Sequence, residues 1–451
     1  MIRYIKKIIG LAGIDGAIAY TVLARVVQAG GGIISIIFIS KYLSKVEQGY
    51  YYTFSSLLAI QIFFELGLSN IITQYVAHEV STLEWHGNSN LIGDNKSKSR
   101  LSSLLRFCVK WFGLIAIILL AALIICGFLF FYRYGKRDEN VEWQLPWVIL
   151  AFITAANLLL SPTLAFLEGL GKVKEVAKIR LFQQIMQLIS MFIFFVLGLK
   201  LFAGPLSAVI SFIFAPLWLL LSPLRTLLIN IWKDLGVWTV NYRSEIFPYQ
   251  WRIALSWISG YFMYQIFNPV IFATEGAKVA GQMGMTLAVL AGVLSVGLSW
   301  INTKVPLFSD FIAKRSYLEL DKVFNRTVIQ SSVITSFSFL LIVLIVYGLK
   351  YFNFQLGNRF LPISLLSLLC LVTFINQLVS AFATYLRCHK REPFLVYSIV
   401  IGLLTALSTV LLGKYFGVYG IIIGYASVTV IISLPWAYRI FITKKRAWHN
   451  E

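Results

Sequence analysis

Cysteine, histidine and acidic residues are all scarce in this chain of 451 residues, which contains four cysteines, four histidines and 19 Asp and Glu. The cysteines have no metal-ligand spacing and lie in or beside apolar segments, at positions 108, 126, 370 and 388. We therefore expect no disulfide and no metal site. We also expect no cofactor and no catalytic residues.

Basic residues outnumber acidic ones, because 39 Lys and Arg give a formal net charge of +20. The chain is nevertheless 59% hydrophobic, with a mean hydropathy of +0.79. A soluble protein this apolar would aggregate, and a protein that binds nucleic acid would not combine this charge with so many apolar residues. The composition therefore indicates a polytopic membrane protein.

Twelve apolar segments are long enough for transmembrane helices, which need about 20 residues. They are residues 17–40, 50–76, 111–132, 145–167, 181–197, 201–223, 254–273, 280–302, 327–349, 361–385, 394–413 and 418–441. The alternating polar pattern of a membrane β-barrel is missing. The segments predict an all-α polytopic membrane protein with about 12 transmembrane helices in two pseudo-symmetric six-helix bundles.

The positions of the Lys and Arg residues predict the orientation of the chain. With the N-terminus in the cytosol, the cytosolic segments hold 28 of these residues and the outer segments hold 10. The positive-inside rule then places both termini in the cytosol. Residues 1–9 suit a short interfacial helix, and the polar stretch between residues 77 and 110 predicts a mobile loop. The one remaining residue, Arg25, lies inside the first predicted helix.

The chain repeats itself weakly. Residues 66–70 (LGLSN) resemble residues 296–300 (VGLSW), at equivalent places in a scheme of six plus six helices. Both halves start from the same side, so the repeat is parallel. The predicted parts are an N-terminal bundle at 1–223, a cytosolic linker at 224–253, a C-terminal bundle at 254–441 and a basic cytosolic tail at 442–451.

Two charged residues lie deep in the predicted helices. Arg25 is about 12 Å from the cytosolic end of its helix, at 1.5 Å per residue. It either snorkels to the headgroups or faces a cavity between the halves, with Gln28 on the same face, and attracts an anion. Glu65 lies at a comparable depth in the next helix. It either forms a packing pair with Arg25 or is a carboxylate whose protonation is coupled to transport.

The seventh segment combines polar residues with a proline. Asn268 and Pro269 interrupt its backbone ladder, and Gln265 precedes them. The proline is either a tolerated kink or the hinge of a moving element. Tyr261 and Tyr264 suit either anchoring at the membrane interface or contact with the faces of sugar rings. Together with Arg25 and Gln28, Tyr261, Tyr264, Gln265 and Asn268 are our candidates for substrate binding.

Three stretches carry a family resemblance: YYYTFSSLLAIQIFFELGLSN at 50–70, EGLGKVKEVAKIR at 168–180 and EIFPYQWRIALSWISGYFMYQIFNPVIF at 245–272. With the two predicted halves, they resemble the Wzx-type oligosaccharide-lipid flippases. These belong to the polysaccharide transporter branch of the multidrug/oligosaccharidyl-lipid/polysaccharide (MOP) exporter superfamily. The resemblance covers nearly the whole chain, which lacks the two terminal helices of the fourteen-helix lipid II flippases.

The resemblance implies a V of two six-helix bundles that rocks between inward- and outward-facing states. It implies a polyprenyl-diphosphate-linked glycan as substrate, such as an O-antigen repeat unit, and an H⁺ or Na⁺ gradient as the driving force. The expected location is the bacterial cytoplasmic (inner) membrane, with membrane lipids around the chain and a polysaccharide polymerase as a partner.

Two rival functions make different demands on the sequence. A cation or drug antiporter of the same superfamily should be rich in intramembrane carboxylates, and only Glu65 lies deep in a predicted helix. A membrane glycan polymerase would need a sizeable outer loop, and the largest one, near residues 133–144, has about a dozen residues. The sequence therefore favours the flippase.

Overall fold

Helices occupy every long apolar segment of the chain. The computed structural model describes residues 16–87, 90–135, 141–234, 236–389 and 391–449, and each predicted transmembrane segment falls on helical residues there. Among the described residues, eight helices can cross a membrane by length and composition, and a ninth crossing results if one bent pair is counted as a single span. The predicted all-α polytopic membrane fold is confirmed, whereas the predicted interfacial helix at 1–9 lies outside the described residues.

The elements follow one another with short connections. The first part of the chain forms α2 (Gly16–Tyr42), α3 (Lys45–Leu58), η1 (Ala59–Gln61), α4 (Ile62–Glu65), α5 (Leu68–Val80), β1 (Leu83–His86), β2 (Asn90–Gly93), α6 (Asn95–Tyr134), α7 (Gln144–Gly169), α8 (Val173–Val196), η3 (Lys200–Phe202), α9 (Ala203–Leu221) and α10 (Leu224–Lys233). The second part forms η4 (Tyr242–Ile246), α11 (Phe247–Tyr264), α12 (Phe267–Glu275), α13 (Ala277–Asn302), α14 (Val305–Ala313), α15 (Tyr317–Tyr351), η5 (Gly357–Arg359), α16 (Ile363–Arg387), α17 (Leu395–Ser427), η6 (Val428–Ser433) and α18 (Leu434–His449).

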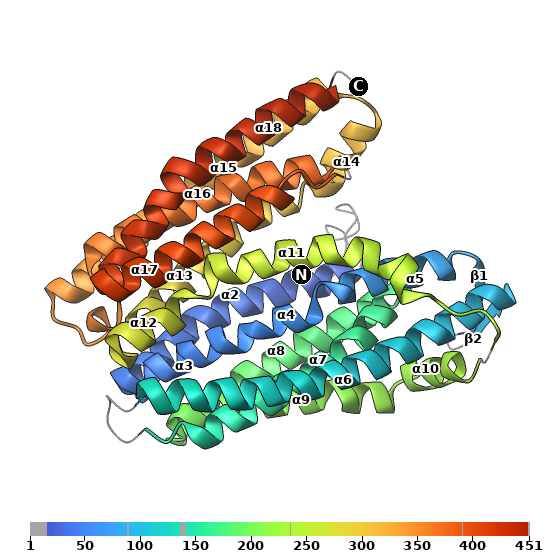
Figure 1. Ribbon diagram of the computed structural model, residues 1–451, viewed down its shortest axis with the longest axis horizontal. Helices are drawn as coiled ribbons and strands as arrows, with labels where there is room; N and C mark the ends of the chain where they lie inside the picture. Colours follow the sequence, from blue (N-terminus) through green and yellow to red (C-terminus); the bar gives the residue numbers. More distant parts are fainter. Residues whose placement is uncertain (1–15, 88–89, 136–140, 235, 390, 450–451) are drawn as a thin grey trace, which may run out of the picture. The chain divides into compact units, whose positions relative to one another are not determined.

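Contacts divide the chain into two compact units. Unit 1 takes the chain up to residue 38 with 58–133 and 142–257, and unit 2 takes 39–57, 134–141 and the chain from 258 onward. Within unit 1, α8 packs on α9, and α7 contacts both α5 and α9 (Figure 1). Within unit 2, α13 contacts α12, α15 and α16, and α16 contacts α18. The predicted bundles at 1–223 and 254–441 stay a prediction, and residues 39–57 belong to unit 2 by their contacts.

The last two predicted segments are joined by a tight turn at Gly417. Its backbone angles are φ 58° and ψ −143°, whereas α17 is helical on both sides of it. A side chain at Gly417 would overlap the carboxylate of Glu275, which accepts a hydrogen bond from the N–H of Val418. Glycine is therefore required both by the left-handed conformation and by the nearby carboxylate.

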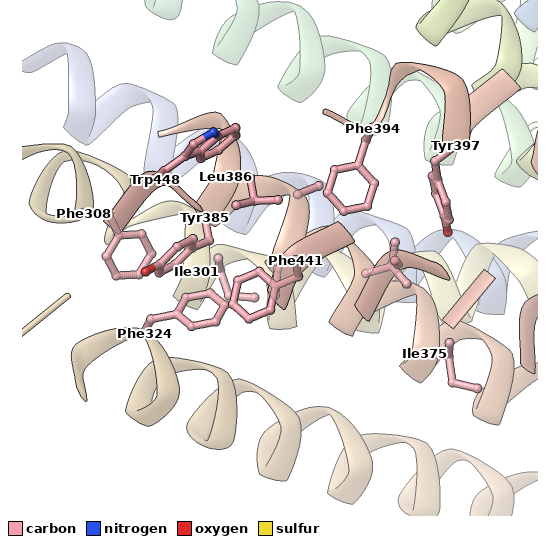
Figure 2. Packing of buried hydrophobic residues seen from close by; sticks show 14 of the residues in the cluster. Ile301, Phe308, Phe324, Ile375, Tyr385, Leu386, Phe394, Tyr397, Phe441 and Trp448 are labelled. Atoms are coloured by element: carbon pink, nitrogen blue, oxygen red, sulfur yellow. The ribbon is translucent and has the colours of Figure 1, made fainter. Parts of the chain in front are cut away.

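An aromatic core closes one end of unit 2. Figure 2 shows the rings of Phe324, Tyr385 and Phe441, which come from α15, α16 and α18. The Phe324 and Tyr385 ring centroids are 4.7 Å apart, and those of Tyr385 and Phe441 are 5.3 Å apart. The Tyr385 hydroxyl donates to Asp321 Oδ1 at 2.7 Å, which satisfies its polar end. Edge-to-face ring packing of this kind holds three helices together.

The polar stretch after α5 contains regular secondary structure in its described residues, and its mobility stays a prediction. The strands β1 and β2 pair antiparallel, with Leu83 opposite Gly93. Helix α6 then begins at Asn95, well before its apolar part. The Asp94 carboxylate accepts hydrogen bonds from the N–H groups of Lys96 and Ser97, at 3.2 and 3.3 Å. Satisfying these two free donors starts the helix earlier than hydropathy predicts.

Candidate functional site

Unit 2 contains a cavity of about 370 Å³ with polar and apolar lining residues, here called the unit 2 pocket. Its volume is within the range of small-molecule sites, about 300–1,000 Å³. Its polar lining residues are Tyr52, Ser55, Ser56, Tyr264, Gln265, Asn268, Thr373, Asn376 and Tyr425. Leucines and alanines of α13, with Phe267 of α12, supply much of the apolar lining. The pocket therefore combines hydroxyl and amide groups with ring and aliphatic surfaces.

The helix break between α11 and α12 places Asn268 in the pocket wall. Residues Gln265 and Ile266 separate the two helices, and Pro269 follows in the first turn of α12, where no intrahelical N–H is needed. The side-chain Nδ2 of Asn268 donates to Ser56 Oγ at 3.2 Å. Its Oδ1 is buried and has no hydrogen-bond partner among the described residues. An unpaired buried acceptor costs about 1–3 kcal/mol of stability.

A second amide and two rings form another part of the wall. Asn376 Nδ2 donates to the hydroxyl of Tyr425 at 2.8 Å. The rings of Tyr425 and Phe267 lie 4.8 Å apart. This contact joins α16 and α17 to α12, so the position of the Asn376 amide is fixed by packing.

The described lining of the unit 2 pocket contains no charged side chain. A charged group buried there without a partner would lose its hydration and gain no ion pair, which costs several kcal/mol or shifts its protonation. A neutral ligand rich in hydroxyl or amide groups meets no such cost. The electrostatics of the pocket therefore favour a neutral polar ligand over an organic cation or an anion.

Three of the predicted substrate-binding residues meet in this pocket: Tyr264, Gln265 and Asn268. Tyr261 does not line it and is buried, with its ring 5.7 Å from that of Phe262. Gln28 is an exposed residue of α2. Arg25 also falls in α2, but its side chain lies outside the described part of the structure.

Sequence reasoning did not assign the remaining polar residues of the pocket to a site. Tyr52 and Ser56 come from α3, Thr373 and Asn376 from α16, and Tyr425 from α17. The local signals are the spacings of Tyr52 with Ser56 and of Thr373 with Asn376, which place each pair on one helix face. The spacing does not show what that face contacts: Tyr52 packs closely against Gly284 of α13, where a side chain would overlap the Cβ of Tyr52.

Glu65, the predicted ion-coupling residue, lies in unit 1 at a break in the second predicted segment. Leu66 and Gly67 are both left-handed, with φ of 52° and 68°, and the helical stretches on either side are bent by 42°. Ser69 Oγ donates to Glu65 Oε1 at 2.7 Å, and it lies 3.0 Å from Ser161 Oγ of α7. Broken membrane helices leave carbonyl groups free and often carry ion sites. The geometry keeps Glu65 as a candidate, and its predicted pairing with Arg25 stays a prediction.

A buried guanidinium was missed by the sequence argument, which treated Arg359 as one of the outer charges that set orientation. Arg359 is 8% exposed. It donates to the carbonyls of Ser40 and Leu43, at 2.9 and 2.6 Å, and to Gln48 Oε1 at 3.1 Å. It thus caps the C-terminal end of α2, where free carbonyls and the helix dipole favour a cation.

Comparisons with known proteins place this arrangement in a known fold. No protein-family model matches the chain, and no curated protein matches it in sequence. An inward-facing multidrug resistance MATE family transporter of the MOP superfamily has a TM-score of 0.59 at 14% identity, over 91% of this chain and 99% of its own. The lipid II flippase MurJ in its inward closed conformation has a TM-score of 0.57 at 14% identity, over 96% and 90%.

A third solved structure is a MOP superfamily transporter from Pyrococcus furiosus, described as having a binding pocket of reversed polarity. Its TM-score is 0.53 at 14% identity, over 96% of this chain and 97% of its own. The chain therefore has the fold of MOP superfamily transporters and is a multi-pass membrane protein.

Proposed function

We propose that this chain is a flippase that moves a polyprenyl-diphosphate-linked oligosaccharide from the inner to the outer leaflet of the bacterial cytoplasmic membrane. The observation that carries this proposal is the uncharged lining of the unit 2 pocket, with amide, hydroxyl and aromatic groups. Sugars present hydroxyls at their edges, which match amide and hydroxyl groups, and C–H groups on their faces, which match aromatic groups. The similarity to a lipid II flippase adds support from the fold.

The other parts of the mechanism follow the same proposal. Glu65 couples transport to an H⁺ or Na⁺ gradient at the break between α4 and α5, and Pro269 lies at the hinge of the α11–α12 break. Arg25 and Gln28 attract the diphosphate, whose negative charge the unit 2 pocket does not accommodate. Both termini lie in the cytosol, and a polysaccharide polymerase receives the product.

Export of an organic cation is the second candidate, because MATE family transporters have the same fold. Such a site needs a carboxylate near its ligand, whereas the described lining of the unit 2 pocket offers none. The carboxylate of Glu65 lies in unit 1 and is hydrogen-bonded to Ser69.

The two candidates are separated by assaying both kinds of cargo in one preparation. The purified full chain is reconstituted in liposomes, and a fluorescent short-chain lipid-linked oligosaccharide and ethidium are followed in parallel. We expect gradient-dependent flipping of the glycan and no movement of ethidium. Rescue of a flippase deletion, with the accumulated lipid-linked glycan measured by mass spectrometry, is the test in cells. Ethidium transport without glycan flipping would show that the proposal is wrong.

A further inference from the structure

A polar cluster lies beside the helix break that follows Glu65 in unit 1. Ser69 Oγ donates to Glu65 Oε1 at 2.7 Å and lies 3.0 Å from Ser161 Oγ. All three residues are partly buried rather than enclosed. The cluster therefore brings together α4, which ends at Glu65, α5, which begins directly after the break, and α7, which carries Ser161.

This cluster has more acceptors than donors. A serine hydroxyl has one hydrogen and two lone pairs, and an ionised carboxylate only accepts. The hydrogen of Ser69 is used on Glu65, so Ser161 must donate its own hydrogen in the contact between the two hydroxyls. Within the described part of the chain, both lone pairs of the Ser161 hydroxyl and further acceptor positions on the Glu65 carboxylate then remain. A cation meets this excess of acceptors, whereas an anion does not.

The helix opposite the break is also short of a donor at this level. Pro162 has no N–H, so the carbonyl of Leu158, four residues earlier, lacks the donor of the usual helical ladder. Leu158 is 3% exposed, so water has little access to replace that donor. Ser161 directly precedes the proline, and the free carbonyl belongs to the same turn of α7. The surroundings of the cluster are therefore rich in oxygen acceptors as well.

We propose that this cluster is a Na⁺ site, in which the Glu65 carboxylate and the hydroxyl oxygens of Ser69 and Ser161 bind the ion. The proposal rests on the proposed flippase function in one respect, since it makes Na⁺ rather than H⁺ the ion that drives transport. A proton needs only the carboxylate and gives the hydroxyl of Ser161 no role. Binding of Na⁺ can be measured without any transport.

Charge and size favour Na⁺ over other metal cations. One carboxylate neutralises one monovalent ion, whereas a divalent ion would leave a net positive charge at membrane depth. Ca²⁺, which is close to Na⁺ in size, takes oxygen ligands at about 2.3–2.6 Å, which places neighbouring ligand oxygens roughly 3.0–3.7 Å apart. The oxygens of this cluster are 2.7 and 3.0 Å apart and reach that spacing by shifts of a few tenths of an ångström. The larger K⁺ needs a wider spacing.

The test measures Na⁺ binding to the purified full chain in detergent. Binding of radioactive Na⁺ is titrated in a scintillation proximity assay, and unfolding temperatures are compared in NaCl, KCl and choline chloride of equal concentration. We expect saturable binding and a higher unfolding temperature in NaCl than in the other two salts, because an ion bound by the folded state stabilises it. Flipping of the short-chain lipid-linked oligosaccharide in proteoliposomes, under an imposed Na⁺ or H⁺ gradient, is a separate readout.

The variants separate ion binding from packing. Ser161→Ala should weaken Na⁺ binding about tenfold, because it removes one neutral ligand and keeps the carboxylate. Ser161→Thr keeps the hydroxyl and should retain most of the binding, whereas Glu65→Gln should abolish it. The matched control is Ser207→Ala. Ser207 is a fully buried serine of α9 whose hydroxyl donates to the carbonyl of Gly204 at 2.7 Å. Its loss should leave the Na⁺ affinity unchanged, whatever its effect on stability.

Three outcomes would overturn the site: no saturable Na⁺ binding by wild type, equally tight binding of K⁺, or Na⁺ binding that Ser161→Ala and Glu65→Gln leave unchanged. The first would leave Glu65 as a proton carrier or as a partner of Arg25. If wild type binds Na⁺ at this cluster but flips no glycan, the proposed function fails and the site stands. If an H⁺ gradient alone drives flipping, the function stands and the assignment of Na⁺ as the driving ion is wrong.

Discussion

Arg359 and Gln48 bind each other reciprocally across 311 residues of sequence. Arg359 Nη1 donates to Gln48 Oε1 at 3.1 Å, and Gln48 Nε2 donates to the carbonyl of Arg359 at 3.4 Å. Gln48 Nε2 also donates to the carbonyl of Gly281 at 2.8 Å. One buried side-chain pair thus ties η5, α3 and α13 together in unit 2.

Replacing Arg359 should destabilise the protein because several acceptors lose their donor at once. The change Arg359→Met removes a donor from the carbonyls of Ser40 and Leu43 and from the Gln48 amide oxygen, and a buried acceptor that loses its donor costs about 1–3 kcal/mol. The unfolding temperature in detergent should fall clearly in Arg359→Met. It should recover in part in Arg359→Lys, which keeps the charge but not the planar guanidinium group. Lys278→Met removes an exposed cation and is the control. Equal unfolding temperatures for the two methionine variants would contradict this role.

The close approach of α3 and α13 should depend on glycine. A Cβ atom on Gly49 would overlap the carbonyl oxygen of Ala277, and one on Gly281 would lie 2.9 Å from the N atom of Gly49. Neither neighbour is a flexible side chain, so Gly49→Ala should force the helices apart and reduce the folded fraction in size-exclusion chromatography. Gly292→Ala, on the same α13, meets nothing within 4 Å. It should be neutral or stabilising by about 0.5–1 kcal/mol, since alanine favours helix.

The sequence was sufficient for the transmembrane segments because hydropathy acts over about 20 residues and needs no tertiary information. It also found Gln265 and Asn268, because polar residues beside a proline are conspicuous in an apolar segment. It did not find Tyr52 or Tyr425, whose positions depend on packing between helices far apart in sequence.

The same limit explains why the sequence did not reveal the contacts of Arg359 or the local structure near Glu65 and in the polar stretch after α5. A count of Lys and Arg gives the side of the membrane, but it cannot show that Arg359 folds back onto the end of α2. The break after Glu65 was also missed, since Leu66 is not a residue that favours a left-handed backbone. Hydropathy likewise gave no sign of β1 and β2, which are held by backbone pairing in a polar stretch.

The ion triad of unit 1 should make stability depend on acid pH. Arg100 bonds to Glu79 at 2.7 Å and also to Glu245, and the hydrogen bond from Arg100 holds the pKa of Glu245 below its usual 4.5. A lowered carboxyl pKa contributes stability above pH 4.5, and this contribution is lost as the pH falls through the folded-state value. Arg100→Gln should lower the unfolding temperature at pH 7 and weaken its decline below pH 4.5. Identical pH profiles for variant and wild type would exclude the triad as the cause.

Two histidines should make the C-terminal end of α18 sensitive to mild acid. Burial lowers the pKa of both His389 and His449 from 6.5, and their ring centroids are 6.1 Å apart. The folded state therefore disfavours their protonation, so stability is full above pH 6.5 and falls as the pH drops below it. The groups facing them are Tyr317, Asp321 and Tyr385, with Arg391 and Lys445 as further cations.

Limited trypsin digestion between pH 7.5 and 5.5 measures the loss of stability at the C-terminal end of α18. Lys444, Lys445 and Arg446 are cleavage sites in the last turns of this helix. Cleavage should increase as the pH falls below 6.5, after correction for the activity of the protease on an unfolded peptide. His449→Phe keeps the ring stacking with Tyr317 and cannot be protonated, so it should shift the onset to lower pH. If the variant is cleaved with the same pH profile as wild type, His449 does not control the stability of the C-terminal end of α18.

Neutralising Glu65 should separate coupling from substrate binding. Glu65→Gln keeps an oxygen that accepts the hydrogen bond from Ser69, so the break at Leu66 and Gly67 should stay intact. The glutamine side chain cannot ionise, so glycan flipping should lose its dependence on an imposed H⁺ or Na⁺ gradient. Binding of the short-chain lipid-linked oligosaccharide should stay within about twofold of wild type. Glu84→Gln, in the exposed part of β1, should change neither property. If Glu65→Gln retains gradient-driven flipping, the carboxylate is a packing group of the helix break, and the coupling residue must be sought elsewhere in the chain.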